Sequence, residues 1–182
     1  MTRKTLLGGV AAAGLAVGVA GVGFADIRTG DTLVINGDIA ITTKAPAPAH
    51  LSDSLDEVMS GWHFRSDETQ AMEMDDFDNP GMIFVEQGVE IWNAVDGGEG
   101  KSCASCHGAP EEMAGVKAVY PKWNEAAGEV RTLQMQVNDC RETRMGAEPW
   151  KTDKGGSIPM EALLASVSRG MPVNVAIDGP AQ

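Results

Sequence analysis

The sequence predicts a mainly α protein with a small N-terminal extension. Three segments have apolar residues at helical spacing, and they begin near residues 78, 130 and 158. A Cys-x-x-Cys-His motif follows the first of these segments directly. The extension before them contains a β-hairpin signal. The length of 182 residues allows one ordinary domain with additional segments.

Residues 1–25 have the layout of a secretory signal peptide. Arg3 and Lys4 give a positive start, and residues 6–24 form an apolar run. Small residues precede the expected cleavage after Ala25. The alternative is an uncleaved membrane anchor, which the many glycines of the run disfavour. We therefore expect an exported protein in an oxidising compartment, the periplasm of a Gram-negative bacterium.

Acidic residues outnumber basic residues throughout the expected mature chain. The full sequence has a formal net charge of −12, and cleavage after Ala25 leaves 12 basic and 26 acidic residues. Such a balance excludes nucleic acid as a partner and disfavours anionic lipid, since both require basic patches. It permits electrostatic steering toward a partner with a basic surface, although solubility alone is an equally simple explanation.

The extension, residues 26–77, contains only short elements. Two apolar runs within residues 32–41 flank Asn36-Gly37, which predicts a short β-hairpin with a two-residue turn. The Pro-Ala-rich residues 44–49 predict an extended linker, and residues 51–60 predict a short helix.

The first of the three main helices is predicted to open at Asp78-Asn79-Pro80, where a capping side chain precedes a proline. The glycines of residues 97–100 end it. The second is predicted from Val130 to about Met145 and the third from Ile158 to Arg169. The acidic run before the first helix, residues 73–78, predicts a solvated loop and helix cap.

The Cys-x-x-Cys-His motif at residues 103–107 predicts covalent attachment of one haem c. The thiols of Cys103 and Cys106 add to the two vinyl groups of the porphyrin, and His107 becomes an axial ligand of the iron. The alternatives are a thioredoxin-like redox pair and a structural disulfide. A redox pair opens a helix after a buried strand, and residues 98–102 do not have the composition of such a strand.

The residues alone leave the sixth iron ligand open. Cys140 is an odd cysteine in an exported chain, and as a thiolate it would lie opposite His107. Arg141 and Arg144 would offset its negative charge. A thiolate ligand lowers the reduction potential relative to His/Met ligation. The other candidates are Met135, Met145, Met160, Met171, His63 and His50.

The order of helix, haem motif, loops, helix and terminal helix resembles that of a class I cytochrome c-like domain. Longer strings resemble the SoxA family, the cytochrome subunits of the SoxAX complex of bacterial thiosulfate oxidation. These strings cover nearly the whole expected mature chain and are far more specific than the haem motif. They are residues 60–65 (SGWHFR), 75–80 (DDFDNP), 100–107 (GKSCASCH), 137–146 (VNDCRETRMG) and 168–175 (SRGMPVNV).

The resemblance has implications for ligands, partners and activity. In dihaem members, the N-terminal domain carries a His/Cys-ligated haem whose cysteine maps onto Cys140. The family forms a heterodimer with SoxX and joins thiosulfate to a cysteine of the carrier SoxYZ, as an L-cysteine S-thiosulfotransferase. The alternative function is a stand-alone periplasmic electron-transfer cytochrome c with His/Met ligation, and a further alternative is a non-catalytic remnant.

One departure from the family pattern concerns the catalytic centre. Family members continue into a second cytochrome domain, whose axial cysteine is catalytic. This sequence has no second Cys-x-x-Cys-His motif and no cysteine after Cys140. We therefore expect an extension at residues 26–77 and a cytochrome c-like haem domain at residues 78–182, without the catalytic domain and without a catalytic residue.

Overall fold

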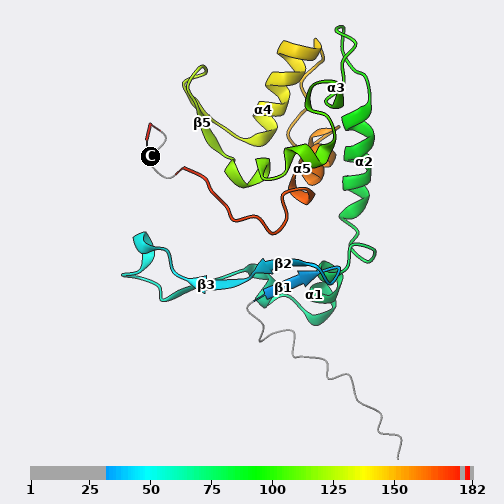
Figure 1. Cartoon of the computed structure of the whole chain (residues 1–182). Coiled ribbons are helices and arrows are strands. Elements are labelled where there is room, and N and C mark those ends of the chain that lie inside the picture. Colours follow the sequence, from blue (N-terminus) through cyan, green and yellow to red (C-terminus); the bar gives the residue numbers. More distant parts are fainter. Residues whose placement is uncertain (1–31, 177–178, 181–182) are drawn as a thin grey trace, which may run out of the picture.

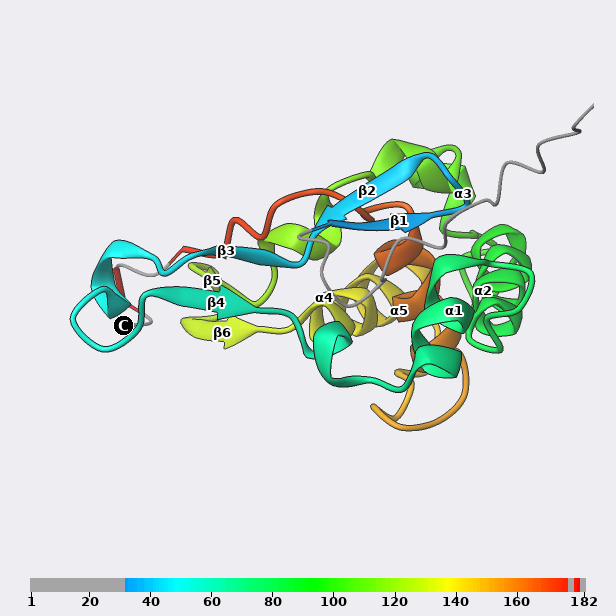
Figure 2. The ribbon, with the colours of Figure 1, turned by 90° about the horizontal axis from the view of Figure 1, so that it is seen from below.

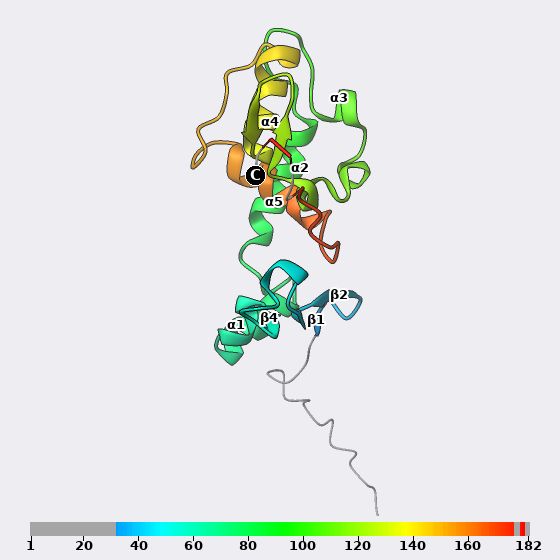
Figure 3. The same cartoon turned by 90° about the vertical axis from the view of Figure 1, so that its left-hand side faces the viewer.

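The computed structural model describes residues 32–176 and 179–180, and the expected signal peptide lies outside them. Figure 1 shows two parts: an N-terminal part, residues 32–77, made mostly of small hairpins, and a helical body, residues 78–176. Figure 3 shows the same separation from the side. This architecture confirms the prediction of a mainly α protein with small hairpins. Across the described ranges, no helix has both the length and the apolar character needed to cross a membrane.

The predicted hairpin is confirmed at the start of the N-terminal part. Strand β1 (Thr32–Ile35) pairs antiparallel with β2 (Ile39–Thr42). Asn36 and Gly37 have φ of 53° and 80°. The Asp38 N–H donates to the Ile35 carbonyl at 3.1 Å and closes a β-turn whose central positions both need positive φ, which Asn and Gly adopt most readily. Because Ile35 pairs with Ile39, three residues connect the strands in place of the predicted two.

The predictions for the next segment are wrong. The supposed linker contains strand β3 (Lys44–Pro46), which pairs with β4 (Glu57–Met59) in place of the predicted helix. Only a short 3₁₀ turn, η2 (Ala49–Leu51), lies between the strands. Pro46 is tolerated because a two-stranded ribbon has edges on both sides, where a missing N–H costs little.

The N-terminal part has a small core of its own. Leu33, Ile35 and Trp62 are buried together. Trp62 belongs to the 3₁₀ turn η3 (Gly61–Phe64), which precedes α1 (Asp67–Met74). The fully buried Gln70 of α1 donates from Nε2 to the Trp62 carbonyl at 3.0 Å, which fixes α1 against η3.

The helical body surrounds the Cys-x-x-Cys-His segment. Its elements are α2 (Met82–Asn93), α3 (Ala104–His107), η4 (Pro110–Met113), η5 (Val116–Val119), β5 (Lys122–Asn124), β6 (Glu129–Arg131), α4 (Leu133–Cys140), the π-helical η6 (Arg141–Met145) and α5 (Ser157–Ser166). Helix α5 packs against α2 and also contacts α4, and it lies between them in the view from below (Figure 2).

The three main helices are confirmed, with shifted ends. Helix α2 begins at Met82 because Asn79 Oδ1 accepts from the Gly81 N–H at 2.9 Å, and this bond forms a turn before the helix. Helix α4 begins at Leu133 because the preceding residues form β6 and Thr132 caps the helix by accepting from the Met135 N–H at 3.2 Å.

The main core lies where α2 crosses α5. Its buried members are Trp92, Leu133, Met160, Leu163 and Leu164. At the crossing, a Cβ on Gly88 would lie 2.4 Å from the Pro159 carbonyl oxygen and 2.7 Å from Leu163 Cβ. Only a glycine lets the two backbones approach this closely.

A Gly88→Ala substitution is therefore expected to lower the free energy of unfolding by about 1–3 kcal/mol, because the added methyl forces the helices apart. Chemical denaturation followed by circular dichroism measures this loss. Gly98→Ala is the matched control, since an added Cβ there has no atom within 4 Å. Equal losses in the two variants would contradict the crossing as the cause.

An ion pair joins the N-terminal part to the helical body. Both carboxylate oxygens of Asp76 accept from the Arg169 guanidinium, at 2.6 and 2.9 Å. Asn36 also donates to Asp76, at 3.0 Å, and accepts from its backbone N–H. The acidic run was predicted as a solvated loop, but one of its residues, Asp76, thus joins the N-terminal part to the helical body. The hydrogen bond from Arg169 is the main cause that lowers the pKa of Asp76.

Asp76→Asn is expected to lower the free energy of unfolding by about 1–2 kcal/mol at neutral pH. The pKa of Asp76 is lower in the folded chain than its ordinary value of 3.8. The ionised carboxylate therefore contributes its full stabilisation to the wild-type protein above that value. It is lost as the pH falls through the folded pKa. Urea denaturation at pH 7 and at pH 3 measures the difference. Asp78→Asn, next to the pair, should change little at either pH.

Candidate functional site

The four residues predicted to bind and ligate a haem all line one cavity. It has a volume of about 590 Å³ and lies in the helical body. Cys103, Cys106 and His107 come from the segment around α3, and Cys140 comes from the end of α4. The structure therefore brings together residues that are up to 37 positions apart, as the prediction requires.

The Cys103–His107 segment forms a single helical turn. The N–H groups of Cys106 and His107 both donate to the Cys103 carbonyl, at 3.1 and 3.0 Å. Ser102 and Ser105 hold this turn by reciprocal bonds, in which each backbone N–H donates to the other hydroxyl at 3.0 and 3.1 Å. Small hydroxyl residues beside the cysteines thus fix the backbone from which both sulfurs project.

Trp92 fixes the other side of the motif. It is buried in the main core, and its Nε1–H donates to the Gly108 carbonyl at 2.9 Å. Its ring centroid lies 5.9 Å from that of His107, at an interplanar angle of 43°. The indole therefore joins α2 to the residue that follows His107 and limits the orientations of the imidazole.

The Cys103 thiol does not have the lowered pKa that is typical of a redox-active cysteine. All three cysteines are free, so Cys103 and Cys106 form no disulfide. Burial is the main cause that raises the pKa of the Cys103 thiol, and the Cys140 and Cys106 thiols add to it, while the charge of Arg141 opposes it. Catalytic redox cysteines have lowered pKa values. The shift at Cys103 disfavours the thioredoxin-like alternative.

Cys140 lies at the last position of α4, where the chain continues as the π-helical η6. Gln136, one turn earlier, donates from Nε2 to Cys140 Sγ at 3.9 Å. Such π-helical turns are frequent at functional sites. The wider helical turn begins directly after the residue predicted to ligate the iron, a detail that the sequence did not indicate.

The cavity narrows the alternatives for the sixth ligand. Met145 and Met160 line it together with Cys140, whereas Met135, Met171, His50 and His63 do not. Met160 belongs to the main core and is 1% exposed. His63 Nε2 is instead hydrogen-bonded to Thr43 in the N-terminal part, at 3.0 Å. Of the predicted candidates, Cys140, Met145 and Met160 therefore line the cavity, and Met113, which the sequence analysis did not consider, lines it as well.

Arg141 connects the two sulfur-bearing segments. It is 5% exposed, and its guanidinium donates to Asp96 at 2.9 Å and twice to the Glu148 carbonyl, at 3.0 and 2.8 Å. It also stacks 3.7 Å above the ring of Trp150. The hydrogen bond from Arg141 is the main cause that lowers the pKa of Asp96. Sequence analysis assigned Arg141 only a charge and missed this connecting role.

Backbone bonds reinforce the connection. The N–H groups of Gly98 and Glu99 donate to the carbonyls of Gly146 and Met145, at 3.1 and 3.0 Å. Lys101 Nζ donates to the Arg144 carbonyl at 3.1 Å. The loop before Cys103 is thus held against the segment after Cys140, so the two walls of the cavity keep a fixed separation.

The donor set fits a haem better than a bare metal ion. Two thiols of one turn are free to form thioether bonds, a neighbouring imidazole is available to the iron, and a third thiol stands apart from them. In the described part of the chain, no group of three or more His, Cys, Asp or Glu side chains converges to hold a metal ion. The volume lies within the usual range for ligand pockets.

Comparison with known proteins defines the class. Residues 87–173 match the family model described as SoxA/TsdA, cytochrome c domain. Residues 87–173 therefore form a cytochrome c domain of the SoxA/TsdA family, and the similarity of the chain is to SoxA. The chain is 56% identical to the L-cysteine S-thiosulfotransferase subunit SoxA of Rhodovulum sulfidophilum, over 98% of this chain and 63% of that protein.

Two further comparisons also show similarity to SoxA. The SoxA subunit of Paracoccus pantotrophus is 48% identical over 96% of this chain and 61% of that protein. The crystal structure of SoxXA from P. pantotrophus matches with a TM-score of 0.78 and 49% identity, over 83% of this chain and 58% of that chain. The chain thus spans about three fifths of the length of the curated relatives described here.

Proposed function

We propose that this chain is the haem-bearing part of a SoxA-type subunit. In this proposal Cys103 and Cys106 would hold one haem c covalently, and His107 and Cys140 would ligate its iron. The observation that carries it is the convergence of these four side chains in one cavity of the helical body. The match of residues 87–173 to a cytochrome c domain family supports haem as the occupant.

The residues of the site have separate tasks in this proposal. A bound haem supplies the one-electron redox chemistry of iron. Cys103 and Cys106 keep the group in place, while Trp92 limits the orientation of the His107 imidazole. The amide of Gln136 donates to Cys140 Sγ, which lowers the basicity of this sulfur and tunes its donation to iron. Apolar side chains such as Leu133, from the main core, exclude water.

We further propose that the chain works in the periplasm, in a SoxAX complex with SoxX that couples thiosulfate to a cysteine of SoxYZ. The similarity to the SoxXA crystal structure and to subunits of L-cysteine S-thiosulfotransferase supports this assignment. No residue of the described chain is proposed as catalytic for sulfur transfer. Its contribution is an electron-transferring or structural haem beside the transferase centre.

The experiment is expression of the full chain in a bacterium that exports and matures c-type cytochromes. The purified protein is expected to show a Soret band and the mass of the polypeptide plus one haem. The double variant Cys103→Ser/Cys106→Ser should lose both. A wild-type protein with the mass of the bare polypeptide and no Soret band would refute the proposal. Co-purification with co-expressed SoxX tests the partner separately.

One observation favours a second candidate function, that of a stand-alone electron carrier with His/Met ligation. Met145 lines the same cavity as Cys140 and is 6% exposed, so a thioether is also placed at the site. The two candidates differ in the optical spectrum, since a weak band at the red end of the spectrum reports iron–methionine sulfur bonding. Thiolate-type electron paramagnetic resonance would instead support Cys140.

A further inference from the structure

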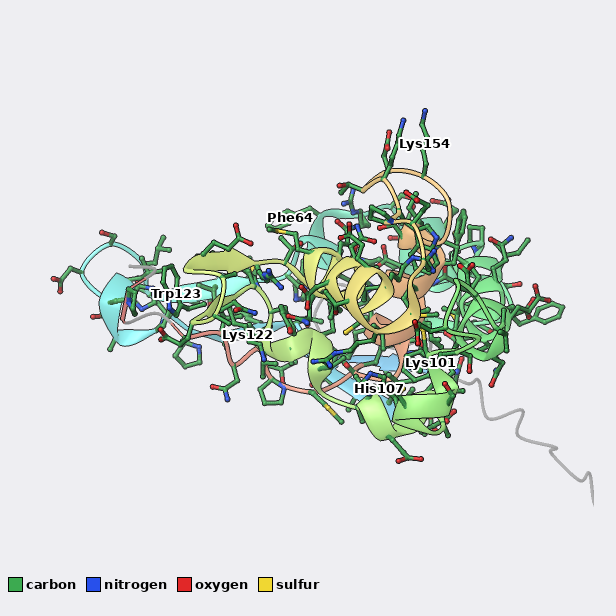
Figure 4. All side chains as sticks on the ribbon, turned by 90° about the horizontal axis from the view of Figure 1, so that it is seen from above. Phe64, Lys101, His107, Lys122, Trp123 and Lys154 are labelled. Carbon is green, nitrogen blue, oxygen red and sulfur yellow. The ribbon has the colours of Figure 1, made fainter. Side chains whose placement is uncertain are left out.

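The cavity has two chemically different ends. The free thiols of Cys103 and Cys106 lie at the end formed by α3, and the residues of β5 line the other end. Helix α3 and the β5–β6 hairpin are on opposite sides of the helical body in both Figure 1 and Figure 2. In Figure 4, Trp123 and Lys122 are labelled at the β5–β6 hairpin, and His107 lies apart from them.

The charge of the cavity is opposite to that of the chain. The whole sequence has 26 acidic and 14 basic residues, yet the cavity is lined by Lys122, Arg141 and Arg144 against one acidic residue, Glu125. Arg141 is committed to Asp96. The Lys122 ammonium stands 4.8 Å from the centre of the Tyr120 ring, and among the described residues it has no acidic partner. Lys122 is therefore a cation available to a bound anion.

Trp123, next to Lys122, has an unused hydrogen-bond donor. Its Nε1–H is buried and has no acceptor among the described residues. The other two buried polar atoms without a partner, on Trp62 and Gln70, belong to the N-terminal part. Buried indole N–H groups usually have an acceptor. A ligand oxygen at the β5 end would supply one.

We propose that Lys122 and the Trp123 indole form a carboxylate-binding subsite for a haem propionate. Haem carries its vinyl groups and its propionates on opposite halves of the porphyrin. Thioether bonds at the α3 end therefore place the carboxylates toward β5. There an ammonium forms a charge-assisted hydrogen bond with one carboxylate, and it also offsets the repulsion from Glu125. This inference rests on the proposed haem function.

The test compares two lysine-to-glutamine variants of the mature holoprotein. Lys122→Gln removes the charge at the subsite, whereas Lys154→Gln removes the same charge from an exposed loop that projects away from the cavity (Figure 4). Losing a cation beside a propionate favours ferric iron. At a fixed solution potential, Lys122→Gln is expected to raise the ferric-to-ferrous ratio by roughly two- to fivefold, the range of a partly exposed ion pair. Lys154→Gln should leave it unchanged.

A second variant reports on the indole. Trp123→Phe removes the N–H, and the resonance Raman bands of propionate bending are expected to shift in this variant and in Lys122→Gln but not in Lys154→Gln. Equal ferric-to-ferrous ratios and equal Raman bands in Lys122→Gln and Lys154→Gln overturn the subsite. A wild-type protein without covalent haem would overturn the proposed function instead. Mass spectrometry therefore distinguishes a failure of the proposed function from a failure of the subsite alone.

Discussion

A Cys140→Met variant is expected to keep its covalent haem and to have a higher reduction potential than the wild-type protein, by on the order of 0.1 V or more. An anionic thiolate stabilises ferric iron, and a neutral thioether does not. The replacement lies at the end of α4, where a longer side chain reaches into the open cavity. Potentiometric titration followed by absorbance measures the shift.

The control for this prediction is a substitution of Met145, a competing candidate for the iron ligand. Met145→Leu removes a thioether sulfur that lines the cavity near Cys140 in the sequence, and it keeps an apolar side chain of similar volume. If Cys140 ligates the iron, Met145→Leu should leave the potential and the spectrum close to those of the wild type. The opposite pattern, a large shift in Met145→Leu and none in Cys140→Met, would assign the site to His/Met ligation.

The sequence predicted those features that depend on local chemistry. The turn at Asn36-Gly37, the helical spacing of apolar residues in α2 and the haem motif each carry their signal within a few residues, and the structure has a hairpin and a helix at the first two. The apolar face of α2 was predicted less well, since Trp92 is buried but Phe84 and Val89 are exposed. The segments before and after η2 were predicted wrongly. The pairing of β3 with β4 depends on residues 11 to 15 positions apart, and an isolated Pro-Ala run has no local mark of such a partner.

The residues of the site also fall into two groups, those that the sequence indicated and those that only the folded structure reveals. Single residues such as Cys140 were identified from their rarity and from family resemblance, and the structure then placed them at one cavity. The role of Arg141 was not predictable, because its partners lie 45 residues before it and 7 residues after it. Nor was the unpaired Trp123 N–H, since only the folded chain shows which buried donors lack an acceptor.

Arg141→Gln is expected to lower the free energy of unfolding by about 2–4 kcal/mol. The substitution removes a buried guanidinium that stacks on Trp150, and it leaves the Glu148 carbonyl without its two donors. Arg141→Lys keeps the charge but cannot reproduce the planar fork, so it should lose an intermediate amount. Denaturant unfolding of the holoprotein measures both.

Arg144→Gln is the matched control, because Arg144 is exposed and lies three positions further along the same segment. Its unfolding free energy should stay within about 0.5 kcal/mol of the wild type. Hydrogen exchange gives a local readout: the amides of Gly98 and Glu99, which bond to the segment after Cys140, should exchange faster in Arg141→Gln. If these amides stay as protected as in the wild type, Arg141 stabilises the body without holding the loop before Cys103, and its connecting role fails.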